Sequence, residues 1–241
     1  MIGVHSPEFE FEKDVANVRR EAKVLHVDYP IAVDSNYTIW NAFDNQYWPA
    51  LYFVDAKGKI RHHHFGEGEY DRSERTIQQL LTSAGDREVS GELVSVTGTA
   101  REAPADWSSL KSPESYLGSA RRDNTGEGKL NHWNLTGDWT VGRESVTLVE
   151  AGGKIGYRFH ARDVHLVMAP GAAGAPVRFR VRLDGAAPGA AGGLDLEPQG
   201  TGRVTEPRLY QLIRQRQPIV DRQLEIEFLD PGVEAFVFTF G

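Results

Sequence analysis

The sequence predicts two domains of different classes, a mixed α/β domain followed by an all-β domain. Apolar residues recur at helical spacing in the first third of the chain, where helical stretches alternate with short apolar runs. Beyond residue 105, apolar and polar residues instead alternate with a period of two, along short segments separated by glycine, alanine and proline. We therefore expect a first domain over residues 1–85, a linker over 86–105 and a second domain over 106–241.

The first domain is organised around a β-hairpin. Residues 50–54 (ALYFV) and 60–65 (IRHHHF) read as two strands, and residues 55–58 form a turn that ends in a glycine suited to positive φ. Pro49 cannot donate a hydrogen bond to a neighbouring strand, so it must stand at the start of the first strand. Trp48 precedes it, and an aromatic residue before proline favours the cis isomer of that peptide bond.

The segments around the hairpin supply further strands and helices. Short apolar runs at residues 2–5 and 30–33 predict strands. We expect a helix from about residue 14 onward and a short helix over 39–43, capped by Ser35 or Asn36. A last helix over 72–84 ends at Gly85.

The second domain shows the alternation that half-buried strands require. In residues 177–183 the apolar positions alternate with Arg178, Arg180 and Arg182, and Asp184 and Gly185 close the strand. Residues 155–159, 224–228 and 236–240 alternate in the same way, and residues 92–96 read as one more short strand. Short strands joined by glycine-rich and proline-rich turns predict an antiparallel β-sandwich of the jelly-roll kind.

Composition excludes several function classes. The net charge is −7 and no segment concentrates lysine or arginine, so a nucleic-acid partner is not expected. No apolar stretch has the length of a membrane span, and the first residues do not read as a signal peptide. The chain has no cysteine, which excludes disulfides, thiol nucleophiles and thiolate metal sites within it. No cofactor is predicted.

The order of elements and two motifs resemble a known family. The stretches IGVHSPEF and NQYWPALYFVDAKGKIRHHHFGEGEYD resemble the thioredoxin-like (redoxin or TlpA-like) part of DipZ-type proteins. SPESYLG, LTGDWTV, RFHARDVHLV and RLYQLIR resemble the domain that follows it in those proteins, which is similar in architecture to carbohydrate-binding modules. The resemblance covers nearly the whole chain.

The resemblance implies a redox groove without its nucleophile. The family has a strand and a helix with Cys-x-x-Cys ahead of the segment that opens this chain, and this chain has no counterpart of them. The cis-proline position of the family falls on Pro49, with Tyr47 and Trp48 before it. The first domain then reads as a thioredoxin-like domain that lacks its first strand and helix. A natural cysteine-free scaffold is the alternative.

These features support three hypotheses about function. The chain is the C-terminal portion of an extracytoplasmic, membrane-tethered thiol–disulfide oxidoreductase that binds a protein at the cis-proline groove. Without cysteines it should have no redox activity alone, so its status as an enzyme stays open. Alternatively, it is a non-enzymatic module that binds a glycan or a protein through the β-sandwich. A third hypothesis is self-association through the edge that the missing strand would leave.

Two side-chain clusters are candidate binding sites. Trp107, Tyr116, Trp133 and Trp139 could form a platform for sugar rings, although aromatic residues in a sandwich more often belong to the core. His62 and His64 share one face of their strand and could reach one metal ion. A structural zinc site takes four ligands, so we expect no metal there and interpret the histidines as part of a strand.

Overall fold

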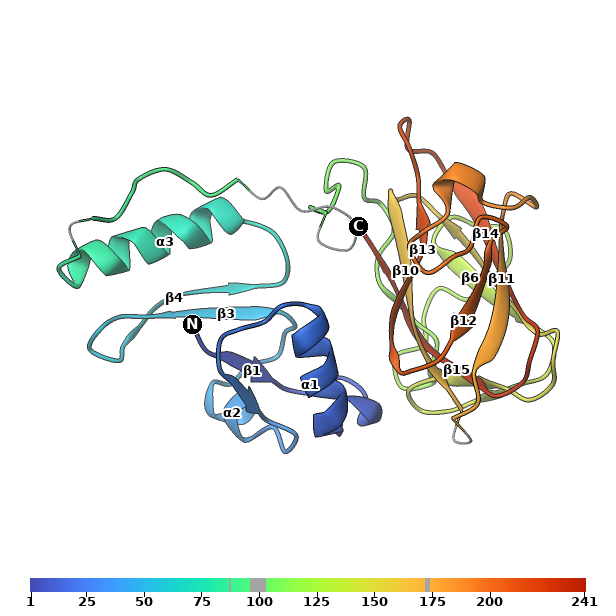
Figure 1. Ribbon diagram of the computed structural model, residues 1–241, viewed down its shortest axis with the longest axis horizontal. Coiled ribbons are helices and arrows are strands. Elements are labelled where there is room, and N and C mark those ends of the chain that lie inside the picture. Colours follow the sequence, from blue (N-terminus) through green and yellow to red (C-terminus); the bar gives the residue numbers. More distant parts are fainter. Residues whose placement is uncertain (87, 96–102, 172–173) are drawn as a thin grey trace. The chain divides into compact units, whose positions relative to one another are not determined.

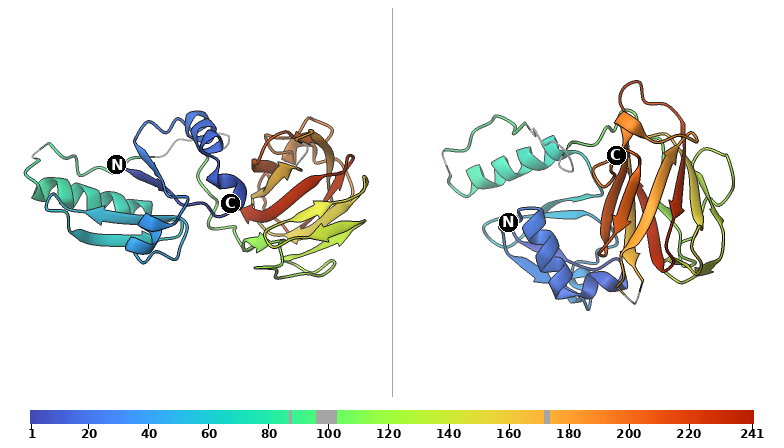
Figure 2. Two further views of the ribbon diagram at one scale, coloured as in Figure 1. Left: turned by 90° about the horizontal axis from the view of Figure 1, so that it is seen from below. Right: turned by 45° about the vertical axis from the view of Figure 1, so that its right-hand side comes forward.

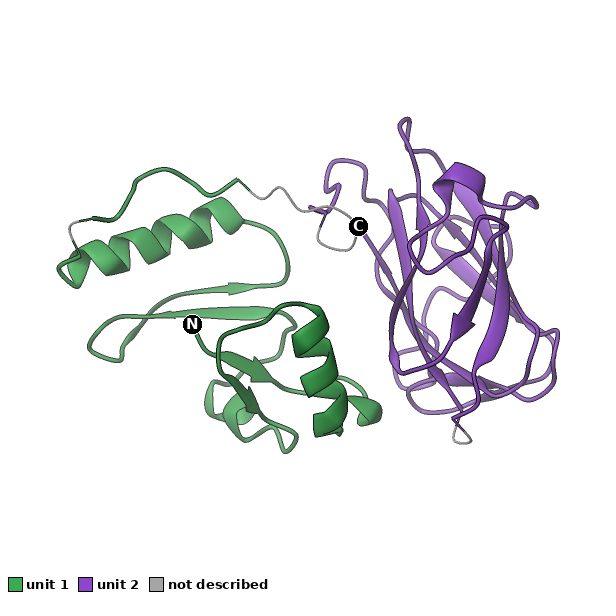
Figure 3. Ribbon diagram, viewed as in Figure 1, with its two compact units in different colours: residues 1–96 green, residues 97–241 purple. Residues whose placement is uncertain are grey.

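The computed structural model describes all residues except 87, 96–102 and 172–173. It divides into two compact units, unit 1 (residues 1–96) and unit 2 (residues 97–241), coloured separately in Figure 3. The division falls inside the segment expected to be a linker. The exact limits of that linker stay a prediction.

Unit 1 contains the expected order of strands and helices. Figure 1 labels most of them. The elements are β1 (Gly3–His5), a 3-10 helix (Glu10–Lys13), α1 (Val15–Val24), β2 (Ile31–Val33), α2 (Thr38–Ala42), β3 (Ala50–Val54), β4 (Ile60–Phe65) and α3 (Tyr70–Ser83). The last helix begins two residues before the predicted start, and Gly85 follows it with φ 99°.

Two expectations about unit 1 were wrong. Residues 92–95 form no strand, because their polar groups bond to α3 instead: Val94 N donates to the Glu74 carboxylate at 3.0 Å, and Glu92 O accepts from Gln78. The side chains of Ser35 and Asn36 do not cap α2. Asp34 does so from further upstream, accepting from the backbone N–H groups at the start of that helix.

The strands of unit 1 form two separate sheets. β1 pairs with β2 in parallel, with Gly3 opposite Ile31, and β3 pairs with β4 in an antiparallel hairpin. The core is small, since the buried apolar side chains described in this unit are Phe9, Val18 and Phe53. Unit 1 therefore has two short ladders and little buried apolar surface to hold them together.

Unit 2 is all-β and consists of two antiparallel sheets, seen as two layers in Figure 2. One has the order β13-β10-β15-β8-β7, with β5 beside β15, and the other has the order β12-β11-β14-β9-β6. The strands are β5 (Ser115–Tyr116), β6 (His132–Thr136), β7 (Trp139–Val141), β8 (Val146–Leu148), β9 (Lys154–Phe159), β10 (Asp163–Pro170), β11 (Val177–Leu183), β12 (Thr201–Val204), β13 (Arg208–Arg214), β14 (Arg222–Phe228) and β15 (Val233–Phe240).

One hydrophobic core joins the two sheets. Phe179 and Ile226 from one sheet belong to the same buried cluster as Leu166, Tyr210 and Phe238 from the other. Strand periodicity produces this core, because every second side chain of β9, β11 and β14 is buried. The all-β second domain is thus present, while the jelly-roll sandwich and the likeness to carbohydrate-binding modules stay predictions.

A buried polar pair lies within this core. Tyr157 Oη and Ser115 Oγ are 2.7 Å apart, and neither residue is exposed to solvent. Burial raises the pKa of Tyr157 to about 12, so its hydroxyl keeps its proton at neutral pH. The pair gives the buried Tyr157 hydroxyl a partner, while Ser115 Oγ also donates to Pro113 O at 3.3 Å.

Tyr157→Phe should lower the free energy of unfolding of unit 2 by about 1 kcal/mol, because Ser115 loses a partner. The Tyr157→Phe/Ser115→Ala double variant should cost less than the sum of the single changes, since it leaves no unpaired hydroxyl. Urea unfolding followed by near-UV circular dichroism measures all three. Strictly additive losses would contradict a direct bond.

Candidate functional site

The candidate site is the loop that leads into β3. The Trp48–Pro49 peptide bond is cis, as the sequence predicted. Pro49 O accepts a hydrogen bond from Gly66 N at 2.9 Å, which extends the hairpin ladder by one pair beyond Ala50 and Phe65. The proline therefore stands immediately before the strand, where its missing N–H forgoes only the last bond of the ladder.

Two exposed aromatic rings flank this proline. The Trp48 ring lies 4.3 Å from the Trp40 ring between centroids, and its Nε1 donates to Ser6 O at 3.0 Å. The Tyr47 ring stacks on Phe65 at 4.8 Å. Trp48 and Tyr47 remain 40% and 53% exposed, so each keeps a face open to a ligand.

Hydrogen bonds of Asn45 and Tyr52 hold the backbone of the loop in place. Asn45 Nδ2 donates to Tyr47 O at 2.9 Å, and Asn45 Oδ1 accepts from Tyr52 Oη at 3.0 Å. The sequence analysis missed this role of Asn45. The signal that could have found it is a short amide side chain two residues before an exposed turn, where asparagine commonly bonds the backbone.

Asp34 supports the loop indirectly, through two residues that contact Trp48. Its carboxylate accepts from Ser6 Oγ at 3.1 Å and from Trp40 N at 2.8 Å, and these two residues are the ones that Trp48 contacts. Burial of Asp34 opposes its ionisation, but the N–H groups of Ile39 and Trp40 and the hydroxyl of Ser6 outweigh burial and lower its pKa. An ionised Asp34 thus connects the end of β1 to α2 and, through both, to Trp48.

The histidines of β4 have different surroundings. The His62 ring packs at 5.4 Å on Phe53. His64 Nδ1 lies 3.9 Å from Glu69 Oε2, and its Nε2 is buried without a partner among the described residues. Nowhere in the described part of the chain do three or more histidine, aspartate or glutamate side chains gather as a metal would require.

The four aromatic residues of unit 2 do not share one platform. Trp133 is 0% exposed and donates from Nε1 to Asp123 O inside the unit, so it offers no face to a sugar, which corrects that part of the expectation. Trp139 packs edge-on against Phe228 at 5.7 Å. Arg121 lies 4.7 Å above the Tyr116 ring. Trp107, about half exposed, is the most accessible of the set.

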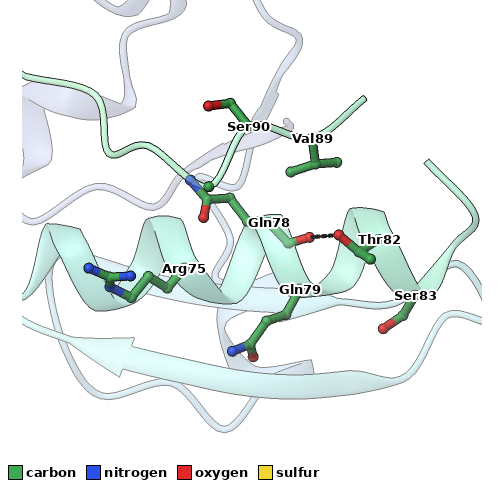
Figure 4. A pocket seen from close by; sticks show the side chains of 8 residues that line it. Arg75, Gln78, Gln79, Thr82, Ser83, Val89 and Ser90 are labelled. Atoms are coloured by element: carbon green, nitrogen blue, oxygen red, sulfur yellow. Dashed lines mark hydrogen bonds between the residues drawn. The ribbon is translucent and has the colours of Figure 1, made fainter. Parts of the chain in front are cut away.

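A cavity of about 450 Å³ lies between α3 and the segment that follows it (Figure 4). Amide, hydroxyl and one guanidinium group line it, from Gln78, Gln79, Thr82, Ser90 and Arg75. Thr82 Oγ1 donates to Gln78 O at 2.9 Å, so part of this polar lining is satisfied within the helix. The lining contains no aromatic or acidic side chain, so it lacks the pairing of groups that acid–base chemistry needs.

Comparisons with known proteins find similarity to thioredoxin-like proteins. Residues 125–241 match the family described as thioredoxin like C-terminal domain. Protein DipZ of Mycobacterium bovis is 34% identical over 184 residues, which cover 70% of this chain and 26% of DipZ. The thiol-disulfide oxidoreductase YkuV of Bacillus subtilis is 31% identical over 81 residues, which cover 34% of this chain and 55% of YkuV. The chain therefore spans about a quarter of DipZ.

The solved structures that this chain resembles are more distant. A family two carbohydrate esterase from Clostridium thermocellum has a TM-score of 0.36 and 13% sequence identity, covering 45% of this chain and 31% of the esterase chain. A likeness this remote supports no argument about a ligand.

Asp34→Asn should destabilise unit 1 by about 1 kcal/mol at pH 7, because the amide accepts fewer hydrogen bonds than the carboxylate at the start of α2. The folded-state pKa of Asp34 is lowered, so its stabilising effect is present above the ordinary carboxyl pKa of about 3.9 and declines as the pH falls through the folded value. The variant should therefore lose less stability than the unaltered chain between pH 5 and pH 3, values chosen to bracket about 3.9. Urea titrations at both pH values test this.

Asp28→Asn is the matched control, since Asp28 is exposed. It should leave stability unchanged at pH 7. Equal effects of the two substitutions would show that Asp34 has no special role.

Proposed function

Because the chain is a DipZ-type thioredoxin-like protein without a cysteine, we propose that it forms the C-terminal portion of an extracytoplasmic thiol–disulfide oxidoreductase. Thiol–disulfide exchange requires a thiolate, which no side chain in these 241 residues supplies. The nucleophile then comes from a cysteine-bearing segment outside them. Unit 1 contributes the groove that holds the protein substrate.

The open edges of the two sheets in unit 1 carry this proposal. Within the described residues β1 pairs with β2 alone, and β3 pairs with β4 alone. Gly3 and His5 direct their backbone groups to β2, so those of Val4, between them, point away from it. Pro49 pairs with Gly66, and by alternation the backbone groups of Ala50 and Tyr52 point away from β4.

The side chains beside these edges are also uncovered. Val4 is 46% exposed and Leu51 is 37% exposed, although both belong to strands whose apolar residues ordinarily enter a core. The end of β1 and the start of β3 lie together, because Trp48 Nε1 donates to Ser6 O. A strand that added to these edges would pair backbone groups and bury apolar surface in one step.

The cis-proline loop is the proposed binding site for the substrate. A substrate strand can pair with the backbone ahead of Pro49, while the Tyr47 and Trp48 rings form the walls of a groove. The side chains of Asn45 and Asp34 hold this loop and its contacts in place without reaching solvent themselves. Such support keeps a binding loop in one conformation.

The proposed location outside the cytoplasm, in the periplasm or cell envelope, rests on the resemblance to DipZ-type proteins. Membrane attachment would come from the rest of the full-length protein. No helix in the described part of the chain combines the length and apolarity that crossing a bilayer requires.

Reduction of insulin disulfides by dithiothreitol tests the proposal. The chain alone should be as inactive as a sample without protein. A fusion that places the strand and Cys-x-x-Cys helix of DipZ before Met1 should accelerate reduction, and the same fusion with both cysteines changed to serine should not. An inactive fusion that is folded by circular dichroism would refute the proposal.

In the active fusion, Tyr47→Ala should lower the rate of reduction several-fold, because it removes one wall of the groove. Tyr70→Ala is the matched control, since Tyr70 has the same exposed fraction of 53% but lies on α3. It should leave the rate unchanged. Equal rates for the two variants would exclude Tyr47 from substrate binding.

The same open edges also favour self-association of the chain. Two copies could pair β1 or β3 edge to edge and cover the apolar residues beside them. Light scattering of the chain alone should then give a mass above that of a monomer, and the DipZ fusion should be monomeric. A monomer at high concentration without the fused segment would exclude this association.

A further inference from the structure

The outer face of the five-stranded sheet in unit 2 is unusually rich in arginine. Alternation along β11 sends Val177, Phe179, Val181 and Leu183 into the core, and it sends Arg178, Arg180 and Arg182 outward. These arginines lie two residues apart, which spaces them by roughly 6.7 Å along the strand. Figure 1 shows β12, β11 and β14 beside one another in this layer.

Neighbouring strands add to the same face. Arg203 on β12 lies opposite Arg178, and Lys154 and Arg158 project from β9. We call this set of six cations, with Glu225 and Glu227 of β14, the arginine face. Asp221 and Asp230 contact its ends. The carboxylate of Glu197 accepts from Thr201 Oγ1, opposite Arg180. Six cations therefore meet five carboxylates, a small excess of positive charge on a chain whose net charge is −7.

Several polar groups of the arginine face are not committed to the fold. Arg178 is held by Asp230 through two bonds of 2.8 Å, and the charge of Arg203 also acts on this carboxylate, helping to lower the pKa of Asp230. Arg182 Nε is buried without a hydrogen-bond partner in the described residues and lies 4.0 Å from Glu225 Oε1. Arg178 and Arg203 lie directly opposite each other, and Asp230 offsets much of their mutual repulsion.

One row across the face combines charged and neutral polar groups. Arg182, Glu225, Gly156 and Asn134 form one row across four strands. An added Cβ at position 156 would lie 2.5 Å from Asn134 Oδ1, so the asparagine amide occupies the space beside the glycine. An amide beside a guanidinium and a carboxylate offers both donors and acceptors, which is the pattern that sugar hydroxyls need.

We propose that the arginine face binds an acidic glycan, a sugar chain that carries carboxylates. Arginine forks bind carboxylates through paired N–H groups, and Arg182 and Arg203 are the least committed of the set. Glu225 and Asn134 accept hydrogen bonds from hydroxyl groups between the charges. This site lies apart from the predicted aromatic platform and needs no stacked ring.

Other polyanions fit this surface less well. The carboxylates Glu225 and Glu227 lie among the cations and would repel the dense phosphates of a nucleic acid. A membrane surface is disfavoured, because these outward positions carry no apolar side chain that could enter the lipid. The inference concerns unit 2 and does not depend on the redox proposal.

Affinity electrophoresis of the full chain through gels that contain polygalacturonate tests the proposal. Fully methyl-esterified polygalacturonate is the matched probe, since it keeps the sugar backbone and lacks the charge. We expect retardation by the acid polymer alone, weakened by added salt. Equal retardation by the ester, or none by the acid, would overturn the proposal. Equal or stronger binding of double-stranded DNA would also overturn it, because the surface would then recognise charge alone.

The Arg182→Gln/Arg203→Gln variant should bind polygalacturonate about tenfold more weakly, from two exposed charge contacts of under about 1 kcal/mol each. Arg216→Gln is the control for the single variant Arg203→Gln, since each removes one positive charge from an exposed position and Arg216 lies outside the arginine face. If the double variant fails to fold, Arg203→Gln alone serves, because Arg203 is exposed. Unchanged affinity in the folded variant would refute the assignment.

Discussion

Every strand of this protein must pair the backbone groups along both of its edges or expose them, and the two units meet this constraint differently. In unit 2, most strands have a neighbour on each side, and only the outermost ladders end in open edges. In unit 1 each of the four strands has one partner. Sheets of several strands bring many apolar side chains together, whereas an isolated pair of strands does not. Unit 2 therefore has a large core and unit 1 a small one.

In unit 1 the loop around Pro49 keeps its conformation although each strand has only one described partner. Its conformation depends on local contacts, namely the hairpin ladder, the Asn45 amide and the packing of Trp48 on Trp40. These contacts do not require a complete sheet. The loop can therefore keep its conformation in a unit whose sheets have open edges, and the end of β1 lies beside it through the bond from Trp48 to Ser6.

In the five-stranded sheet of unit 2, strand pairing places apolar side chains on one side and charged or polar side chains on the other. Strand periodicity sends one set of side chains into a dry core and the other set onto an exposed face. On β11 the exposed set is entirely arginine, and the register aligns it with glutamates of β14 and with Arg203 of β12. The fold tolerates this repulsion because Asp230, Glu225 and Glu227 offset most of it.

The sequence by itself determined the class of each domain, the hairpin and the start of β3 at Pro49. These features depend on neighbouring residues, whose periodicity and turn chemistry are visible along the chain. The sequence also indicated the arginines of β11, although not which residues stand opposite them. It did not predict the cap by Asp34, since sequence reasoning favoured the nearer Ser35 and Asn36.

Only the tertiary structure decided which residues meet across long separations. It buried Trp133, which the sequence could not distinguish from a surface aromatic residue, because burial depends on which face of β6 meets the other sheet. It connected Asp34 to Ser6 and Trp40, and it placed Arg203 opposite Arg178. Strand order and register set these contacts, and neither leaves a periodic signal in the sequence.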